Sequence, residues 1–202
     1  NEHRSESDIR AFKYQIYTYA FYKFYTGYSL GLDMPELLPE VDLILRHLID
    51  TQDGSDNYED METILYFIML FNRTEFLDDY RKLLQKSEQR DFYLDYLVQT
   101  VDPTWQLHTQ KLRCPKHTQP LYEVIMLLKE NKAEAVQRLR RYLKRQWILT
   151  LRKGVITHHD LKDDNYRGFW CIAAAALVKA LKLDDTELKD CKYYPCDMAH
   201  FC

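Results

Sequence analysis

An alanine-rich segment near the end of the chain places the strongest constraint on the fold. Four consecutive alanines, Ala173 to Ala176, lie among larger apolar residues that recur every three or four positions. This spacing predicts a helix with an apolar face, and short alanine side chains let a second helix approach that face closely. We therefore expect this segment to serve packing and not chemistry. Its apolar positions are Phe169, Ile172, Ala173, Ala176, Leu177, Ala180 and Leu181.

Glycine and proline are scarce in this chain, which favours helices over strands. Its 202 residues include only 5 glycines and 6 prolines, too few for the many tight turns of a β-sandwich. Hydrophobic residues make up 46% of the sequence, enough for one sizeable core or for two helical halves packed as one globule. The sequence therefore predicts an all-α protein, a compact multi-helix bundle of two packed helical halves.

A connector between the halves is expected at residues 102–120, which contain three prolines and no sustained helical periodicity. We place the boundary there, with an N-terminal helical region over residues 1–105 and a C-terminal region over residues 106–202. Periodicity and capping residues predict the individual helices. They are expected at about residues 8–28, 35–50, 57–72, 74–86, 89–101, 121–130, 133–151 and 169–181.

The first expected helix is rich in aromatic residues. Nine of the seventeen residues from Phe12 to Tyr28 are aromatic, too many for one narrow stripe. Such a helix is either buried around most of its circumference or presents a tyrosine face to a partner, because a tyrosine ring is apolar while its hydroxyl tolerates water. Large aromatic residues are usually inside, so we expect burial.

Membrane and export signals are absent from the sequence pattern. No apolar run approaches the roughly 18 to 20 residues that span a bilayer. The polar stretch from Asn1 to Asp8 lacks the apolar core of a signal peptide. We expect a cytoplasmic protein that does not contact the membrane.

The five cysteines indicate reduced thiols, since they are odd in number and scattered along the second half of the chain. Four residues near the end offer the sulfur and imidazole ligands that zinc accepts, namely Cys191, Cys196, His200 and Cys202. Their spacing lacks the paired short-loop pattern of zinc modules. We expect free cysteines, no metal and no cofactor.

The C-terminal segment resembles a known family in the order of its parts. An Arg-Gly-Phe-Trp entry leads into the alanine-rich helix, Leu183-Asp184-Asp185 stops it, and Tyr193-Tyr194-Pro195 follows with Asp197. This order resembles the C-terminal region of the PoNi-type immunity proteins, bacterial antidotes to PoNe-type DNase toxins. Further upstream, Asp91 to Leu97 resembles the middle helix of that family. We expect the Tyr-Tyr-Pro segment to fold back over the alanine-rich helix, with partners for its hydroxyls.

The resemblance implies a function in competition between bacteria, through toxins delivered between cells by systems such as type VI secretion. A protein of this family would have no catalytic activity. It would bind and neutralise one cognate DNase toxin in the cytoplasm, without contacting nucleic acid itself.

Charge is separated along the chain, and the separation points to a binding surface. The span from Tyr28 to Glu62 carries a net charge of −9, and the span from Lys129 to Lys153 carries +7. A DNase needs a basic groove to hold phosphates, so an antidote gains association rate and specificity by presenting carboxylates. The predicted toxin-binding residues are Asp50, Asp53, Asp56, Glu59, Asp60 and Glu62, with a second patch at Asp160, Asp163 and Asp164.

Part of this acidity has a local explanation. Asp56 or Asn57 can cap the third helix, and Asp164 can cap the alanine-rich helix. Acids in a first turn also favour the positive end of the helix dipole.

Three other functions remain as alternatives. A metal-dependent hydrolase would use His158, His159 and Asp160, but consecutive residues point about 100 degrees apart on a helix. A nucleic-acid binder would use the basic helix that contains Arg138 to Arg145, although the pI near 6.2 argues against it. A helical adaptor or regulatory protein without a toxin partner would share the fold and the charge.

Overall fold

The computed structural model describes residues 5–52, 57–86, 90–152 and 168–202. These ranges contain helices and no strand, which confirms the all-α prediction. The elements are α1 (Glu6–Ser29), α2 (Met34–Thr51), α3 (Tyr58–Leu70), η1 (Thr74–Phe76), α4 (Leu77–Lys86), α5 (Phe92–Val101), α6 (Pro115–Leu128), α7 (Lys132–Arg145), α8 (Trp147–Arg152), α9 (Ile172–Leu181), η3 (Thr186–Leu188) and α10 (Cys196–Ala199).

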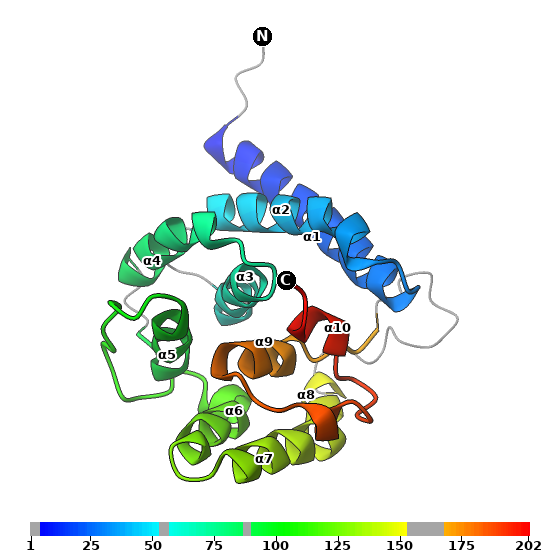
Figure 1. Ribbon diagram of the computed structural model, residues 1–202. Helices are drawn as coiled ribbons and strands as arrows, with labels where there is room; N and C mark the ends of the chain where they lie inside the picture. Colours follow the sequence, from blue (N-terminus) through cyan, green and yellow to red (C-terminus); the bar gives the residue numbers. More distant parts are fainter. Residues whose placement is uncertain (1–4, 53–56, 87–89, 153–167) are drawn as a thin grey trace. The chain divides into compact units, whose positions relative to one another are not determined.

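The chain forms two compact units, Asn1–Gln89 and Arg90–Cys202. In the first unit α1 lies along α2 (Figure 1). Gly27 permits this close approach, because a Cβ there would lie 2.7 Å from Cδ2 of Leu37 on α2. At the other end of the same contact, Nζ of Lys13 lies 2.7 Å from Oδ2 of Asp50. The core of this unit contains Phe24, which packs against Phe67 and Phe71.

The expectation that α1 is buried around most of its circumference is wrong. Only Tyr17, Ala20, Phe24 and Gly27 are buried on this helix. Other large side chains lie in solvent, among them Phe12, Tyr14 and Tyr19, the last with 76% of its surface exposed. The inward face holds about one fully buried residue per turn, too few positions for all nine aromatic residues. Part of the aromatic surface of α1 is therefore exposed, and whether it meets a partner stays a prediction.

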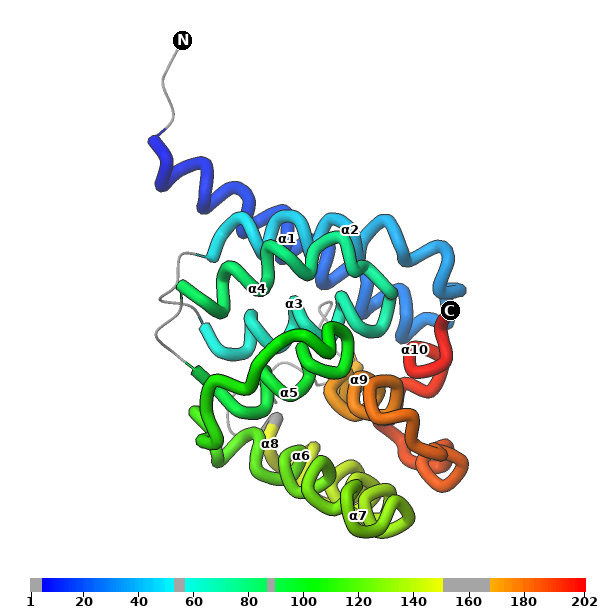
Figure 2. The backbone as a smooth tube through the Cα atoms, turned by 60° about the vertical axis from the view of Figure 1, so that its left-hand side comes forward, coloured from blue at the N-terminus to red at the C-terminus, as the bar shows by residue number. Residues whose placement is uncertain are grey.

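In the second unit α6 and α7 lie side by side as a helical hairpin (Figure 2). The long helix expected at residues 133–151 is divided into α7 and α8 at Gln146. Directly after the break, Nε1 of Trp147 donates a hydrogen bond to the carbonyl oxygen of Phe169, at 2.7 Å. This bond ties the start of α8 to the segment that leads into α9.

The alanine-rich helix α9 forms the core of this unit, as expected. Ala174, Ala175 and Ala176 have no exposed surface. The helix begins at Ile172 with Cys171 at its N-cap, and among the described residues no side chain caps it. Asp164, which the sequence suggested as the cap, lies outside the described residues.

The segment between α5 and α6 belongs to the second unit, although the sequence suggested a connector and a boundary near residue 105. Two buried carboxylates of α5 and its N-cap hold this segment. Asp91 accepts hydrogen bonds from the N–H groups of Leu94 and Arg113, and Asp95 accepts from Nε1 of Trp105 and the N–H of His108. The prolines thus mark a loop that packs on its own unit.

Within the ranges given above, no helix is both long enough and apolar enough to cross a membrane.

Candidate functional site

The acidic block comprises the predicted toxin-binding residues Asp50, Asp53, Asp56, Glu59, Asp60 and Glu62. It belongs to the first unit and spans the end of α2 and the start of α3. Asp50 is in the last turn of α2, while Glu59 and Asp60 are in the first turn of α3. The side chain of Asn57 caps α3 by accepting a hydrogen bond from the N–H of Glu59, as the sequence predicted for Asp56 or Asn57. Acids in this first turn also favour the positive end of the helix dipole. Asp53 and Asp56 lie outside the described residues.

Glu62 differs from the other members of the block because it is buried, with 4% of its surface exposed. Its Oε1 accepts a hydrogen bond from the hydroxyl of Tyr66, at 2.8 Å. A buried carboxylate needs such partners, and this one serves the interior of the unit. It is not available as a surface carboxylate.

An aromatic ring lies beside the acidic block. Tyr14 of α1 is 44% exposed and packs edge-on against Tyr17, with ring centroids 5.3 Å apart. The pKa of its hydroxyl is raised by partial burial and further by the negative charge of Asp60. Tyr14 is therefore the aromatic residue that the fold brings to the acids, and the sequence alone did not single it out.

A histidine lies on α2 close to the same surface. Burial lowers the pKa of His47, the negative charge of Asp50 opposes that shift, and the positive charges of Lys13 and Arg46 add to it. Its Nδ1 is buried and has no hydrogen-bond partner among the described residues. The neutral imidazole is therefore favoured in the folded protein.

The second acidic patch and the histidine pair cannot be placed. Asp160, Asp163 and Asp164, with His158 and His159, lie outside the described residues. The hydrolase alternative, which depends on these histidines and Asp160, is therefore not tested by the described residues.

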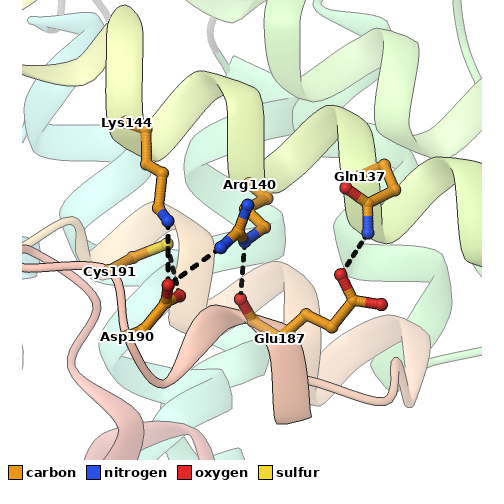
Figure 3. A network of polar contacts seen from close by, with 6 residues as sticks. All are labelled: Gln137, Arg140, Lys144, Glu187, Asp190 and Cys191. Carbon is orange, nitrogen blue, oxygen red and sulfur yellow. Dashed lines mark hydrogen bonds and ion pairs between the residues drawn. The ribbon is translucent and has the colours of Figure 1, made fainter.

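Several basic residues of α7 form ion pairs with carboxylates of their own unit. Figure 3 shows Arg140 and Lys144 both reaching Oδ2 of Asp190, at 2.8 and 2.9 Å, while Gln137 reaches the carboxylate of Glu187. These contacts lower the pKa of Asp190, with the bond from Lys144 as the largest cause. Part of the positive charge of α7 is therefore neutralised within the unit.

An open hollow lies beside this helix, between α6 and α7, with a volume of about 700 Å³. Arg138, Arg141 and Arg145 line it together with Glu123 and Glu130. Nε of Arg138 already lies 2.6 Å from Oε2 of Glu123. The lining thus carries cations and carboxylates but neither a thiol nor an imidazole.

The Tyr-Tyr-Pro segment folds back on α9 as predicted. The N–H of Cys171 donates to the carbonyl oxygen of Tyr193, at 2.8 Å, and the buried hydroxyl of Tyr194 donates to Oδ2 of Asp185, at 2.6 Å. Asp185 is itself buried, at 4% exposed. Asp185 lies just after α9, so its carboxylate links the end of this helix to the Tyr-Tyr-Pro segment.

The tail cysteines do not gather as the zinc alternative required. Cys191 is buried and its Sγ lies beside Asp190, whereas Cys196 and His200 face Asp185. Ligand atoms of Asp185, Cys196 and His200 lie within 4.8 Å of one another. The fold thus assembles a different set from the one that the sequence suggested, with a carboxylate in it.

These features define an all-α protein whose second unit is built around a small-residue helix and buried carboxylates. Residues 89–198 match the model of the family described as PoNe immunity proteins (PoNi), C-terminal. The match covers more than half of the chain, which therefore belongs to this family. It also coincides closely with the second unit, Arg90–Cys202. Neither a curated protein nor a solved structure matches the chain.

Proposed function

We propose that this protein is an immunity protein that binds and neutralises one cognate PoNe-type DNase toxin. The observation that carries the proposal is the family match over residues 89–198. The toxin would be delivered between cells, for example by type VI secretion. The antidote would act in the cytoplasm of the producing cell or of a sister cell, where the DNA to be protected lies.

The protein would act by binding alone, without catalysis. Support comes from the family match, because an immunity protein protects a cell by binding the toxin. The ion pairs of α7 also support binding to a protein and not to nucleic acid, because Arg140 and Lys144 already hold Asp190. Cations that are paired within the fold neutralise fewer phosphates.

The toxin-binding surface would lie on the first unit, at the acidic block. Asp50 and Glu59 are exposed there, Asp60 is partly exposed, and Asp53 and Asp56 are close to them in sequence. Tyr14 beside Asp60 would supply an apolar contact at the edge of the acids. Carboxylates that meet the basic groove of a DNase would speed the encounter, and a buried ring would slow dissociation. The patch of Asp160, Asp163 and Asp164 is a second candidate for contact.

Co-expression with a DNase toxin encoded beside this gene tests the function. We expect the antidote to restore growth of cells that produce the active toxin. We also expect a stable complex when it is purified with a catalytically inactive toxin. The inactive toxin separates the two readouts, because binding can then be measured without selection for survival.

Failure of both rescue and complex formation with every adjacent nuclease would remove the proposal. A helical adaptor or regulatory protein would then be the better description. Complex formation without rescue would mean that the protein binds the toxin but does not neutralise it, which also contradicts the proposed function.

A further inference from the structure

A carboxylate, a thiol and an imidazole, each a possible metal ligand, lie close together after the alanine-rich helix. Oδ2 of Asp185 lies 2.8 Å from Nε2 of His200 and 3.9 Å from Sγ of Cys196. Cys196 and His200 are four residues apart at the two ends of the short helix α10, so they project from the same side of one helical turn. Asp185 comes from the loop after α9. The cluster therefore joins two segments that are separated in sequence.

The chemistry of these ligands fits a zinc ion. Zinc is bound in proteins by thiolate sulfur, imidazole nitrogen and carboxylate oxygen, usually in tetrahedral geometry. Bond lengths of about 2.0–2.3 Å place tetrahedral ligand atoms roughly 3.3–3.8 Å apart. The oxygen-to-sulfur distance of 3.9 Å is already close to that range, and the oxygen-to-nitrogen distance needs to open by about half an ångström. Calcium and magnesium are disfavoured, because they take oxygen ligands.

A hydrogen bond holds the carboxylate of this cluster in place. The side chain of Asp185 is 6% exposed, and the hydroxyl of Tyr194 donates to its Oδ2. Partners of this kind orient metal ligands and are important for affinity. His200 is 56% exposed on its side chain, so solvent reaches the cluster from the outer side. Solvent can therefore supply both the cation and a water as fourth ligand.

Zinc binding would release the proton of the Cys196 thiol, because the thiolate is the form that binds the metal.

We propose that Asp185, Cys196 and His200 bind one zinc ion, with water as the fourth ligand. The ion fixes α10 to the loop after α9. This site is independent of toxin binding, and its role is to stabilise the second unit.

The test uses the full chain, first stripped of metal with a chelator and then titrated with zinc chloride against a chromophoric competitor. We expect one zinc ion per chain and a higher melting temperature when zinc is bound. Cobalt(II) in place of zinc should give the visible bands of a tetrahedral site and a near-ultraviolet thiolate-to-cobalt band. Cys196→Ser should abolish the thiolate band, because its hydroxyl is a poor ligand for these ions.

Each ligand variant should weaken zinc binding more than tenfold, which is the lower end of the effect of outer partners alone. The ligand variants are Cys196→Ser, His200→Gln and Asp185→Asn, and Tyr194→Phe should weaken binding about 10- to 100-fold through Asp185. Cys114→Ser and His117→Gln serve as matched controls in the same unit, and should bind zinc as the parent does.

Two results would overturn the site. The first is a parent protein that takes up no zinc at micromolar concentrations. The second is a Cys196→Ser variant that folds and retains both the zinc affinity and the thiolate-to-cobalt band, since another cysteine would then be the ligand. Because zinc uptake and melting are measured without a toxin, failure here leaves the immunity function standing.

Discussion

The hydroxyl of Tyr194 lies 2.6 Å from Oδ2 of Asp185, and both residues are buried. Such a bond to a charged group stabilises a fold more than a neutral one does, because the carboxylate has lost its water and depends on this donor. The returning C-terminal segment is therefore fixed on α9 by a specific polar contact as well as by apolar packing.

Removing this donor should destabilise the second unit. We expect Tyr194→Phe to lower the free energy of unfolding by about 1.5–3 kcal/mol in metal-free protein, because Asp185 loses a donor in a buried place. Urea denaturation measures the change. Tyr193→Phe is the control, since its hydroxyl has no hydrogen-bond partner within the described ranges, and it should unfold like the parent. Equal stability of the two variants would contradict the prediction.

The close packing around α9 should not tolerate a larger side chain. Ala176 has no exposed surface, so Ala176→Leu should cost about 1–3 kcal/mol through overpacking. Thermal unfolding followed by circular dichroism gives the result. Ala133→Leu provides a control on an exposed alanine of α7, where the added bulk extends into solvent. An unchanged melting temperature for Ala176→Leu would mean that the helix is not packed as described.

Charge in the acidic block should control how fast the toxin binds. We expect the double reversal Asp56→Lys and Glu59→Lys to slow association and weaken its dependence on salt, with the fold unchanged. Stopped-flow or surface-based kinetics at several salt concentrations measures both quantities.

The matched control for this reversal changes net charge equally but elsewhere. Glu36→Lys with Glu75→Lys alters two exposed acids of the first unit outside the block. If both double variants slow association alike, overall charge and not the acidic block is responsible. If neither does, the interface lies elsewhere, with Asp160, Asp163 and Asp164 next to be tested.

The aromatic ring beside the acids should control how long the complex lasts. Tyr14→Ala is expected to weaken toxin binding by about 2 kcal/mol, or roughly 30-fold, mainly through faster dissociation. Tyr19→Ala removes an equally large and more exposed ring from another part of α1, and should have little effect. If only Tyr19→Ala weakens toxin binding, the toxin-binding surface includes Tyr19 and not Tyr14.

The histidine near the block gives a prediction on pH. Because burial lowers the pKa of His47, its imidazole should titrate below the ordinary value of 6.5, which NMR of the ring protons measures directly. The unfolded chain then binds more protons than the folded one, so this contribution to stability is present above pH 6.5 and declines as the pH falls. Lys13→Met removes a cation that lowers the pKa and should raise the midpoint. A midpoint at or above 6.5 in the parent protein would contradict the burial described here.

The sequence predicts most of the helical framework, because periodicity and capping depend on neighbouring residues. The alanine-rich helix and the return of Tyr193 to Pro195 were both correctly expected. The burial of α1 was not, since aromatic content alone does not say how many sides of a helix have neighbours. The same limit applies to Glu62. The sequence pattern does not distinguish this buried carboxylate from the exposed carboxylate of Glu59, three residues earlier.

Polar contacts over longer distances were beyond the sequence pattern. In the sequence, Asp91 and Asp95 indicated only a resemblance to the middle helix of the family. In the structure each carboxylate accepts a hydrogen bond from the backbone of a loop residue more than ten positions away. The pairing of Cys196 and His200 with Asp185 depends likewise on where the loop after α9 turns. Such sets are assembled by tertiary structure, and neither local spacing nor residue type reveals them.

Four of the buried positions in α9 are already alanine, and this affects how the protein can be studied. An alanine scan, the usual search for important side chains, substitutes nothing from Ala173 to Ala176 and would leave the centre of the second unit unmarked. Substitutions that add volume are the ones that report on it. Sequence variants that look harmless there, such as alanine to valine, are those most apt to reduce the amount of folded protein in the cell.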